Sequence, residues 1–380
     1  MTVRTGMGIW GSRYLSPKLA TEAAQGIEAV GRGAVDQFVL WDQLTNWWPQ
    51  ALWEPGVTPL AGMVPDVDSL QDPFTTAAFA LAGVSDLGFA ICTDATRREP
   101  AELAQTMLTL AAATTGRATL CLGAGEVRHI APFGRKRSTG LNRLEEALQV
   151  LRLLLTERGL VNFDGEIWKL RDAWLGNAGK DHRPEIIAMG GGPRLIEMAL
   201  RYADGFATGA PFVYADPEEY GAAVKELRQR LEEYGRGDDD FTFGLHHIVF
   251  LCEDRDEFER YVDNPLMKWY AATGGRINQP DWDAEGIEPV LPRDWHYAFH
   301  MKPAGMSRAE VDEIIDRVPP DMVRKTFFYG TPAEIAERIK PYAAAGCDLH
   351  LIADLSPLMV PIEPKVWLER YTEVCRLVKG

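Results

Sequence analysis

The chain has 380 residues, of which 46% are hydrophobic and 25% are charged, and its formal net charge is −15. These fractions are average for a globular protein, and they exclude a disordered or fibrous chain. The negative charge disfavours binding to nucleic acid or to anionic lipid, because proteins bind both mainly through Lys and Arg.

The first ten residues lack the basic and then apolar pattern of a signal peptide, and no stretch approaches the roughly 20 apolar residues that span a bilayer. We therefore expect a cytoplasmic protein without a membrane span. The cysteines show no CxxC spacing and lie mostly in apolar runs, which predicts reduced, structural thiols at Cys92, Cys121, Cys252, Cys347 and Cys375.

Short apolar runs predict eight β-strands, and most of the runs precede a segment of helical periodicity. In chain order the runs are 6–10, 37–41, 87–92, 118–122, 185–189, 205–208, 243–251 and 347–353. A helix is predicted at about 18–32, and the clearest helical segments are 101–114, 143–157, 217–234 and 332–345. This alternation is typical of an α/β protein, and eight strands favour a closed (β/α)8 TIM barrel over an open doubly wound sheet. Such barrels routinely exceed about 250 residues, so we expect one domain over residues 1–380.

Two connections are too long for simple turns and predict insertions, one after the second strand at 43–72 and one between the seventh and eighth strands at 274–306. Both are rich in aromatic residues, namely Trp47, Trp48 and Trp53 in the first and Trp282, Trp295, Tyr297 and Phe299 in the second. These rings could line an apolar substrate site, or they could anchor the insertions to the barrel.

In a barrel of this type the active site lies where the strands end at the C-terminal face. The residues at those positions are Trp10, Ser12, Asp42, Gln43, Thr93, Asp94, Glu126, Arg128, His129, Gly190, Gly191, Gly192 and Thr208. The carboxylates of Asp42 and Glu126 suit proton transfer or the orientation of a donor, if burial raises their pKa values. A helix cap or a surface charge is the alternative for each.

The three glycines before the helix at Pro193 predict an anion site, because their N–H groups and the helix N-terminus favour a phosphate. The run does not match GxGxxG, so a dinucleotide fingerprint is not supported, and a tight turn is the alternative. Arg97, Arg98 and the basic run 135–137 suit an anionic cofactor tail or a solvated loop.

Other catalytic classes are disfavoured. His246 and His247 are neighbours in a strand and point to opposite faces, and His296 and His300 lack the glutamate of HExxH, so no metal site is predicted. No GxSxG elbow is present, which argues against a hydrolase.

Several ordered segments resemble the luciferase-like superfamily. They are 91–101, 104–105, 115–117, 122–126, 188–193, 202–206, 329–334 and 345–348, and they extend over most of the chain. The Gly-Ala-Gly-Glu run at 123–126 resembles the branch that uses coenzyme F-420, a deazaflavin. The long aromatic insertions resemble the phthiodiolone ketoreductases of that branch more than its glucose-6-phosphate dehydrogenases.

The resemblance implies roles for particular residues. Asp42 and Glu126 match acidic positions beside the cofactor, and Trp47 matches a tryptophan that lines the reaction face. A non-proline cis peptide is common in the third strand of this family and would fall at Ala90–Ile91. The residues expected to contact the cofactor are thus Asp42, Ala90, Ile91, Cys92, Glu126, Gly190, Gly191, Gly192 and Thr208. Those expected to contact the substrate are Trp10, Trp47, Trp48 and Trp295.

The sequence departs from the family pattern at two positions. Gln43 replaces a catalytic histidine and cannot act as an acid or a base. His129 stands where an asparagine is usual. Our hypothesis is that His129 or Glu126 handles the proton, in a catalytic group that also contains Asp42 and Gln43.

The function predicted from the resemblance is hydride transfer between F-420 and a ketone, alcohol or enone on a fairly apolar small molecule. One alternative is an FMN-dependent monooxygenase on the same barrel. The other alternative is a protein that binds the cofactor without turnover. The reason to consider it is that Gln43 replaces the catalytic histidine of the family. The resemblance also implies a homodimer.

Overall fold

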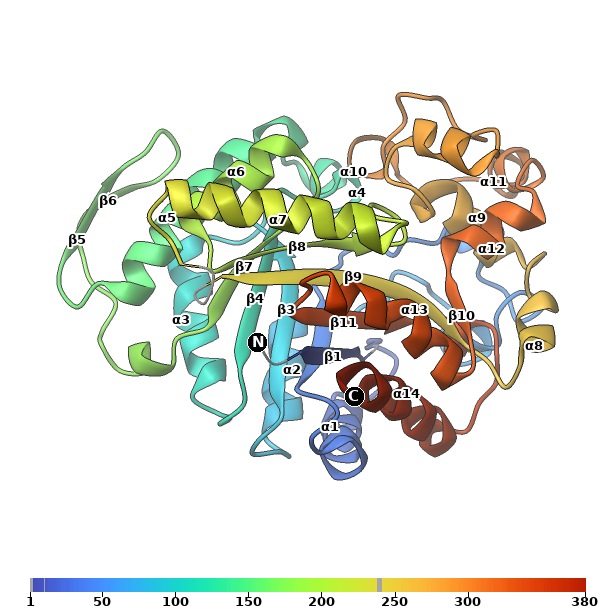
Figure 1. The fold of residues 1–380 in the computed structure, drawn as a ribbon, viewed down its shortest axis with the longest axis horizontal. Coiled ribbons are helices and arrows are strands. Elements are labelled where there is room, and N and C mark those ends of the chain that lie inside the picture. The colour runs from blue at the N-terminus through green and yellow to red at the C-terminus, as the bar shows by residue number, and fades with distance from the viewer. Residues whose placement is uncertain (1–2, 10, 238–240) are drawn as a thin grey trace.

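The computed structural model describes residues 3–9, 11–237 and 241–380. Its centre is a closed barrel of eight parallel strands (Figure 1). The barrel strands are β1 (Arg4–Gly8), β2 (Gln37–Trp41), β3 (Gly88–Asp94), β4 (Ala118–Gly123), β7 (Glu185–Met189), β8 (Gly205–Ala210), β9 (Thr242–Leu251) and β11 (Leu349–Asp354). They hydrogen-bond in this order, and the pairing of β11 with β1 closes the ring. The predicted (β/α)8 barrel and its eight strands are therefore confirmed.

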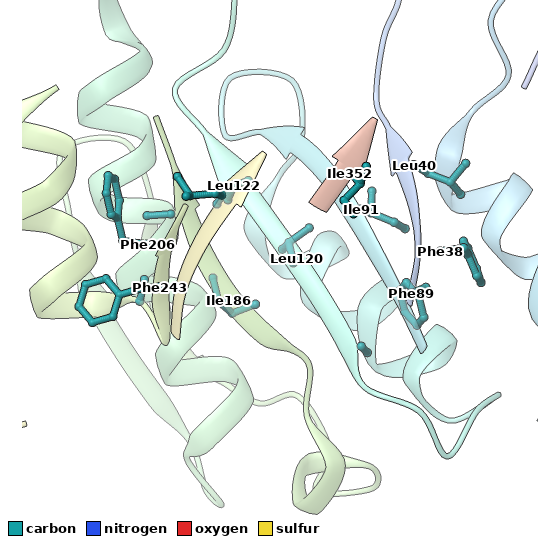
Figure 2. Packing of buried hydrophobic residues seen from close by; sticks show 14 of the residues in the cluster. Phe38, Leu40, Phe89, Ile91, Leu120, Leu122, Ile186, Phe206, Phe243 and Ile352 are labelled. Atoms are coloured by element: carbon teal, nitrogen blue, oxygen red, sulfur yellow. The ribbon is translucent and has the colours of Figure 1, made fainter. Parts of the chain in front are cut away.

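Helices surround the barrel and bury the outward-facing side chains of the strands. They are α1 (Lys18–Gly31), α2 (Pro73–Leu81), α3 (Pro100–Ala111), α5 (Gly140–Thr156), α6 (Pro193–Tyr202), α7 (Pro217–Glu233), α13 (Pro332–Ala344) and α14 (Pro364–Lys379). Several begin with proline after a capping residue, as α13 does with its Thr331–Glu334 capping box. Figure 2 shows outward-facing residues such as Phe38, Ile91 and Leu120 on neighbouring strands.

The side chains between these outward-facing positions fill the barrel, because successive residues of a strand point to opposite faces. This interior cluster contains Val39, Ala90, Cys92, Cys121, Ile187, Ala207, Leu349 and Leu351. All five cysteines are free and buried, as predicted.

One expectation about the third strand is wrong. The peptide bond between Ala90 and Ile91 is not cis, and among the described residues the cis bond is Ala210–Pro211. Ala90 and Ile91 continue the regular pairing of β3 with β2 and β4, which an extended trans backbone supplies. A non-proline cis bond costs about 3 kcal/mol, and here it would break this pairing.

A polar layer closes the N-terminal end of the barrel, which we call the floor. Arg4 donates two hydrogen bonds to the carboxylate of Glu185, at 2.8 and 3.1 Å, and a third to Thr242 Oγ1 at 2.8 Å. Gln37 donates to Thr119 Oγ1 at 2.7 Å, and that hydroxyl donates to Glu185 at 3.3 Å. The floor thus joins β1, β2, β4, β7 and β9 across the barrel.

The first insertion contains two short 3-10 helices, η1 (Gln50–Leu52) and η2 (Pro59–Gly62). The second insertion is longer than the predicted 274–306, because it begins directly after β9 and continues past residue 306. Its helices are α8 (Arg255–Glu259), α9 (Pro265–Gly274), η7 (Gln279–Glu285), α10 (Tyr297–His300), α11 (Arg308–Ile315) and α12 (Pro320–Thr326). After α12, β10 (Phe328–Gly330) pairs with the end of β9. The two insertions share one hydrophobic core, the insertion core, which includes Trp48, Trp53, Trp269 and Trp282.

A hairpin that the sequence did not predict, β5 (Val161–Asp164) and β6 (Lys169–Ala173), projects from the side of the barrel (Figure 1, left). The Glu146 carboxylate accepts hydrogen bonds from the backbone N–H groups of its turn at Glu166, Ile167 and Trp168. Within the described ranges, no helix has the length and apolar character needed to cross a bilayer.

Candidate active site

The C-terminal ends of the barrel strands form one edge, the mouth, and Asp42 lies there directly after β2. Its carboxylate accepts hydrogen bonds from Thr93 Oγ1 at 2.6 Å, Arg97 Nη1 at 3.0 Å and Arg98 Nε at 2.8 Å. Burial opposes ionisation, but the hydrogen bond from Arg98 and the charges of Arg97 and Arg98 lower the pKa of Asp42 overall. This carboxylate is therefore held as an anion.

The two arginines beside Asp42 also pair with other carboxylates. Arg97 Nε lies 2.5 Å from Asp94 Oδ2, and Arg98 Nη2 lies 2.8 Å from Asp72 Oδ2. Both guanidinium groups therefore have partners within the protein. Arg97 connects the ends of β2 and β3, and Arg98 connects Asp42 to Asp72 at the end of the first insertion.

Glu126 follows β4 and immediately precedes the short helix α4 (Val127–Ile130). Its Oε2 atom accepts from Arg128 Nε at 2.7 Å. The guanidinium of Arg128 also donates to the Thr45 carbonyl and lies 5.2 Å from the ring of Trp47. Arg128 is almost wholly buried, whereas the Glu126 side chain keeps 27% of its surface exposed, so Glu126 is the accessible member of the pair.

His129 lies on the same short helix, α4, and hydrogen-bonds to the backbone of the first insertion. Its Nδ1 atom accepts from the backbone N–H groups of Leu44 and Thr45, each at 3.3 Å. Burial and the charges of Arg128 and Arg97 lower the pKa of His129 well below its ordinary value. His129 is thus a neutral ring that positions residues 44 and 45, and the half-buried Gln43 directly precedes them.

Trp47 connects the first insertion to the second. Its indole Nε1 donates to Thr273 Oγ1 at 2.8 Å, and its backbone carbonyl accepts from Trp269 Nε1 at 2.9 Å. The ring centroids of Tyr270 and Tyr297 lie 5.4 and 5.2 Å from that of Trp47. The structure therefore brings Trp47 together with Glu126 and Arg128 at the mouth.

The other predicted substrate tryptophans lie in different surroundings. Trp48 is buried in the insertion core, and its indole donates to the Leu266 carbonyl at 3.2 Å. This placement fits the alternative that the ring anchors the insertion. Trp295 is half-buried, and its ring lies 6.4 Å from that of His300. Trp10 lies outside the described residues.

In the barrel interior just below the mouth, the predicted Cys92 lies beside His246 and beside Trp41, which the sequence did not single out as a site residue. Cys92 Sγ lies 3.8 Å from His246 Nε2, and the ring of Trp41 lies 6.2 Å from that of His246. Ala90 faces the same interior, whereas the side chain of Ile91 faces the surrounding helices. Strand alternation from Val39 to Trp41 was the signal that could have found Trp41.

The glycine turn after β7 has the features of an anion site. Gly191 is exposed, and a Cβ atom there would lie 3.8 Å from Thr208 Oγ1. That hydroxyl is buried, and no described residue hydrogen-bonds to it. The turn leads into α6, whose first turn has no side-chain cap. An unpartnered hydroxyl beside free helix N–H groups fits the phosphate of a cofactor.

The chain is similar to several characterised proteins. The sequence profile of the luciferase-like monooxygenase family matches residues 47–349. A phthiodiolone/phenolphthiodiolone dimycocerosates ketoreductase of Mycobacterium kansasii is 28% identical over 322 residues, which cover 83% of this chain and 86% of that protein.

Two solved structures share the fold. An F-420-dependent secondary alcohol dehydrogenase, in complex with an F-420–acetone adduct, superposes with a TM-score of 0.70 at 19% identity and covers 100% of this chain and 99% of its own. A long-chain alkane monooxygenase superposes with a TM-score of 0.66 at 18% identity and covers 100% and 90%. Because the profile spans most of the barrel, this chain belongs to the luciferase-like family of oxidoreductases.

Proposed function

We propose that this protein is an oxidoreductase that uses coenzyme F-420 and transfers hydride between the deazaflavin and a ketone, alcohol or enone of a fairly apolar substrate. The observation that carries the proposal is the set of groups at the mouth, which contains the unpartnered Thr208 hydroxyl beside the glycine turn, the accessible Glu126 carboxylate and the ring of Trp47. The names of the ketoreductase relative and of the alcohol dehydrogenase neighbour support the same chemistry.

The cofactor would be held by residues from four barrel strands or the turns that follow them, β2, β3, β7 and β8. Gly190, Gly191, Gly192 and Thr208 would border a phosphate, because the Thr208 hydroxyl is unpartnered and the first turn of α6 has no side-chain cap. Ala90 and Cys92 in β3, with Asp42 beside them, would border the ring system. When bound, a deazaflavin supplies a hydride donor or acceptor, and the protein must position the substrate and manage one proton.

Among the groups proposed for the proton, Glu126 is the best placed. Asp42 is held as an anion by three hydrogen bonds, and Gln43 has no ionisable group. His129 is neutral, and its Nδ1 lone pair is already used by two backbone N–H groups. Glu126 uses only Oε2 toward Arg128, so Oε1 is available to exchange a proton at the mouth.

Titration with the two candidate cofactors tests the proposal. The 11 tryptophans provide a fluorescence signal that a bound flavin quenches. We expect F-420 to bind tightly and FMN to bind far more weakly. Tight FMN binding without a response to F-420 would favour a monooxygenase, as the alkane monooxygenase neighbour suggests, and binding of neither would favour a protein without turnover.

A pair of glycine variants locates the cofactor phosphate. In Gly191→Ala the new methyl group would lie beside Thr208 Oγ1, so we expect cofactor affinity to fall about tenfold or more. Gly176→Ala is the matched control, because a Cβ atom there meets nothing within 4 Å. Equal affinities of the two variants would place the phosphate elsewhere.

The homodimer remains a proposal from the resemblance. Light scattering of the purified chain, whose calculated mass is 42.3 kDa, distinguishes a monomer from a dimer.

A further inference from the structure

Two segments beside the mouth carry positive charge that the protein does not neutralise. The loop after α4, residues 131–139, and the segment around α10, residues 295–306, contain no Asp or Glu, although the net charge of the chain is −15. Their cations are Arg135, Lys136, Arg137 and Lys302. None of these four forms an ion pair with a described residue, whereas Arg97 and Arg128 at the same mouth do.

The two segments are neighbours in space. The helix α10 packs against α4 (Figure 1), and the guanidinium carbon of Arg137 lies 4.6 Å from the ring centroid of Phe299 on α10. Phe133 ends the 3-10 helix η3 (Ala131–Phe133), which follows α4 directly, so four residues of chain keep it within about 14 Å of Arg137. We call the four cations together with Phe133 and Phe299 the rim patch.

The rim patch combines this charge with exposed aromatic rings. The side chains of Phe133 and Phe299 are each 50% exposed. An exposed ring alone needs no explanation. Trp174, for example, is 61% exposed, but it follows the β5–β6 hairpin, where Lys169 and Arg171 pair with Asp164. Exposed apolar rings among unpaired Lys and Arg residues are instead typical of proteins that bind at a membrane surface.

The charge of the rim patch restricts its partner. Unpaired cations attract an anionic surface, and ionic screening over about 8 Å lets the local charge outweigh the more distant acidic residues at contact. A second copy of this chain, packed through the same patch about a twofold axis, would set the cations against one another. An apolar substrate favours lipid as the anionic partner, because such a molecule dissolves in a bilayer rather than in water.

We propose that the rim patch docks the mouth of the barrel onto an anionic lipid surface. Phe133 and Phe299 enter the headgroup region, and the four cations contact lipid phosphates. The choice of lipid rests on the apolar substrate of the proposed function. Docking brings the mouth to the bilayer, so that the substrate reaches the site without crossing bulk water.

Vesicle binding tests the surface without cofactor or turnover. The full chain is sedimented with vesicles of phosphatidylglycerol and phosphatidylcholine in equal parts, and with vesicles of phosphatidylcholine alone. We expect binding to the anionic vesicles to be at least about tenfold tighter. Raising the salt concentration from about 0.1 to 0.5 M should release most of the protein, because the cations act through the screened surface potential.

Single substitutions identify the side chains that make the contact. Phe133→Ser and Phe299→Ser should each weaken binding to the anionic vesicles about three- to tenfold, because a buried ring is lost. Lys136→Gln should weaken it about fivefold. The matched controls are Trp174→Ser, at an exposed ring of the hairpin region, and Lys340→Gln, at an exposed cation of α13, and both should bind as the wild type does.

The remaining outcomes overturn the inference. A wild type that binds neither kind of vesicle has no lipid surface, and losses of the same size in the control variants would show that binding is not localised at the rim patch. A dimer that dissociates in Phe133→Ser, as measured by light scattering, would assign the patch to a second copy of the chain.

The F-420 titration is read separately from vesicle binding. A protein that binds anionic vesicles through the rim patch but does not bind F-420 would contradict the proposed cofactor and leave the docking surface standing. Tight F-420 binding without vesicle binding would contradict the docking surface alone.

Discussion

Arg128 is almost wholly buried, and three neighbours use its guanidinium at once: the Glu126 carboxylate, the Thr45 carbonyl and the ring of Trp47. A lysine keeps the charge but lacks the planar fork that serves all three. We expect Arg128→Lys to lower the free energy of unfolding by about 1–3 kcal/mol. Urea unfolding measures this loss. The control is Arg135→Lys at an exposed position, whose free energy of unfolding should differ from that of the wild type by less than about 0.5 kcal/mol.

His129 gives a second prediction at the scale of one side chain. His129→Ala leaves two N–H groups of the first insertion without an acceptor, so we expect kcat/KM to fall about tenfold. His129→Asn should recover most of it, because an amide oxygen can accept from the same N–H groups.

The pH profile separates the two roles of His129. With its pKa well below the ordinary value, His129 should contribute no inflection in kcat/KM between about pH 6 and 8. An inflection near pH 6.5 in the wild type that disappears in His129→Asn would instead assign the proton to this ring.

At the scale of elements, the two insertions stabilise one another through the insertion core. Trp53 is buried there and donates to the Val64 carbonyl at 2.5 Å. Trp53→Ala should cost about 3–5 kcal/mol. Thermal unfolding followed by near-ultraviolet circular dichroism measures the loss, and Trp174→Ala is the matched control because that tryptophan is 61% exposed. Equal effects of the two changes would contradict the insertion core.

The elements also show what the sequence could predict. Each barrel strand is a compact apolar run, and these runs, most of them followed by a segment of helical periodicity, were enough to find all eight strands. The β5–β6 hairpin was missed because its two strands are short and largely exposed, so they carry no apolar run. The contact between Tyr270 and Trp47 could not be predicted, because the two residues are distant in sequence and only the fold brings their rings together.

The whole molecule should lose stability in mild acid. The buried histidines His129, His246, His247 and His350 have pKa values lowered by burial, to about 4 for His246 and about 3 for His350. Their stabilising effect is complete above the unfolded-state pKa of about 6.5. As the pH falls below that value, these histidines are protonated in the unfolded chain but stay neutral in the folded chain. The free energy of unfolding therefore decreases.

One substitution measures the contribution of a single ring. His350 Nδ1 lies 2.9 Å from His247 Nε2, and an asparagine can keep a polar contact there. Between pH 7 and pH 5, His350 should account for about 2 kcal/mol of the decrease in the wild type. Urea unfolding of His350→Asn at both pH values should show a correspondingly smaller decrease, and an unchanged difference would contradict the assignment.

The floor of the barrel has a consequence for biosynthesis. Arg4 leaves the ribosome before its partners, because Glu185 follows 181 residues later and Thr242 follows 238 residues later. At typical rates of translation, Glu185 is synthesised on the order of 10 to 40 s after Arg4. The other edge of β1 pairs with β11, which is made later still. Until β11 is synthesised, the nascent chain therefore has an open strand edge, and until Glu185 is synthesised it has an unpaired arginine. Both are available during that time to chaperones that bind exposed segments.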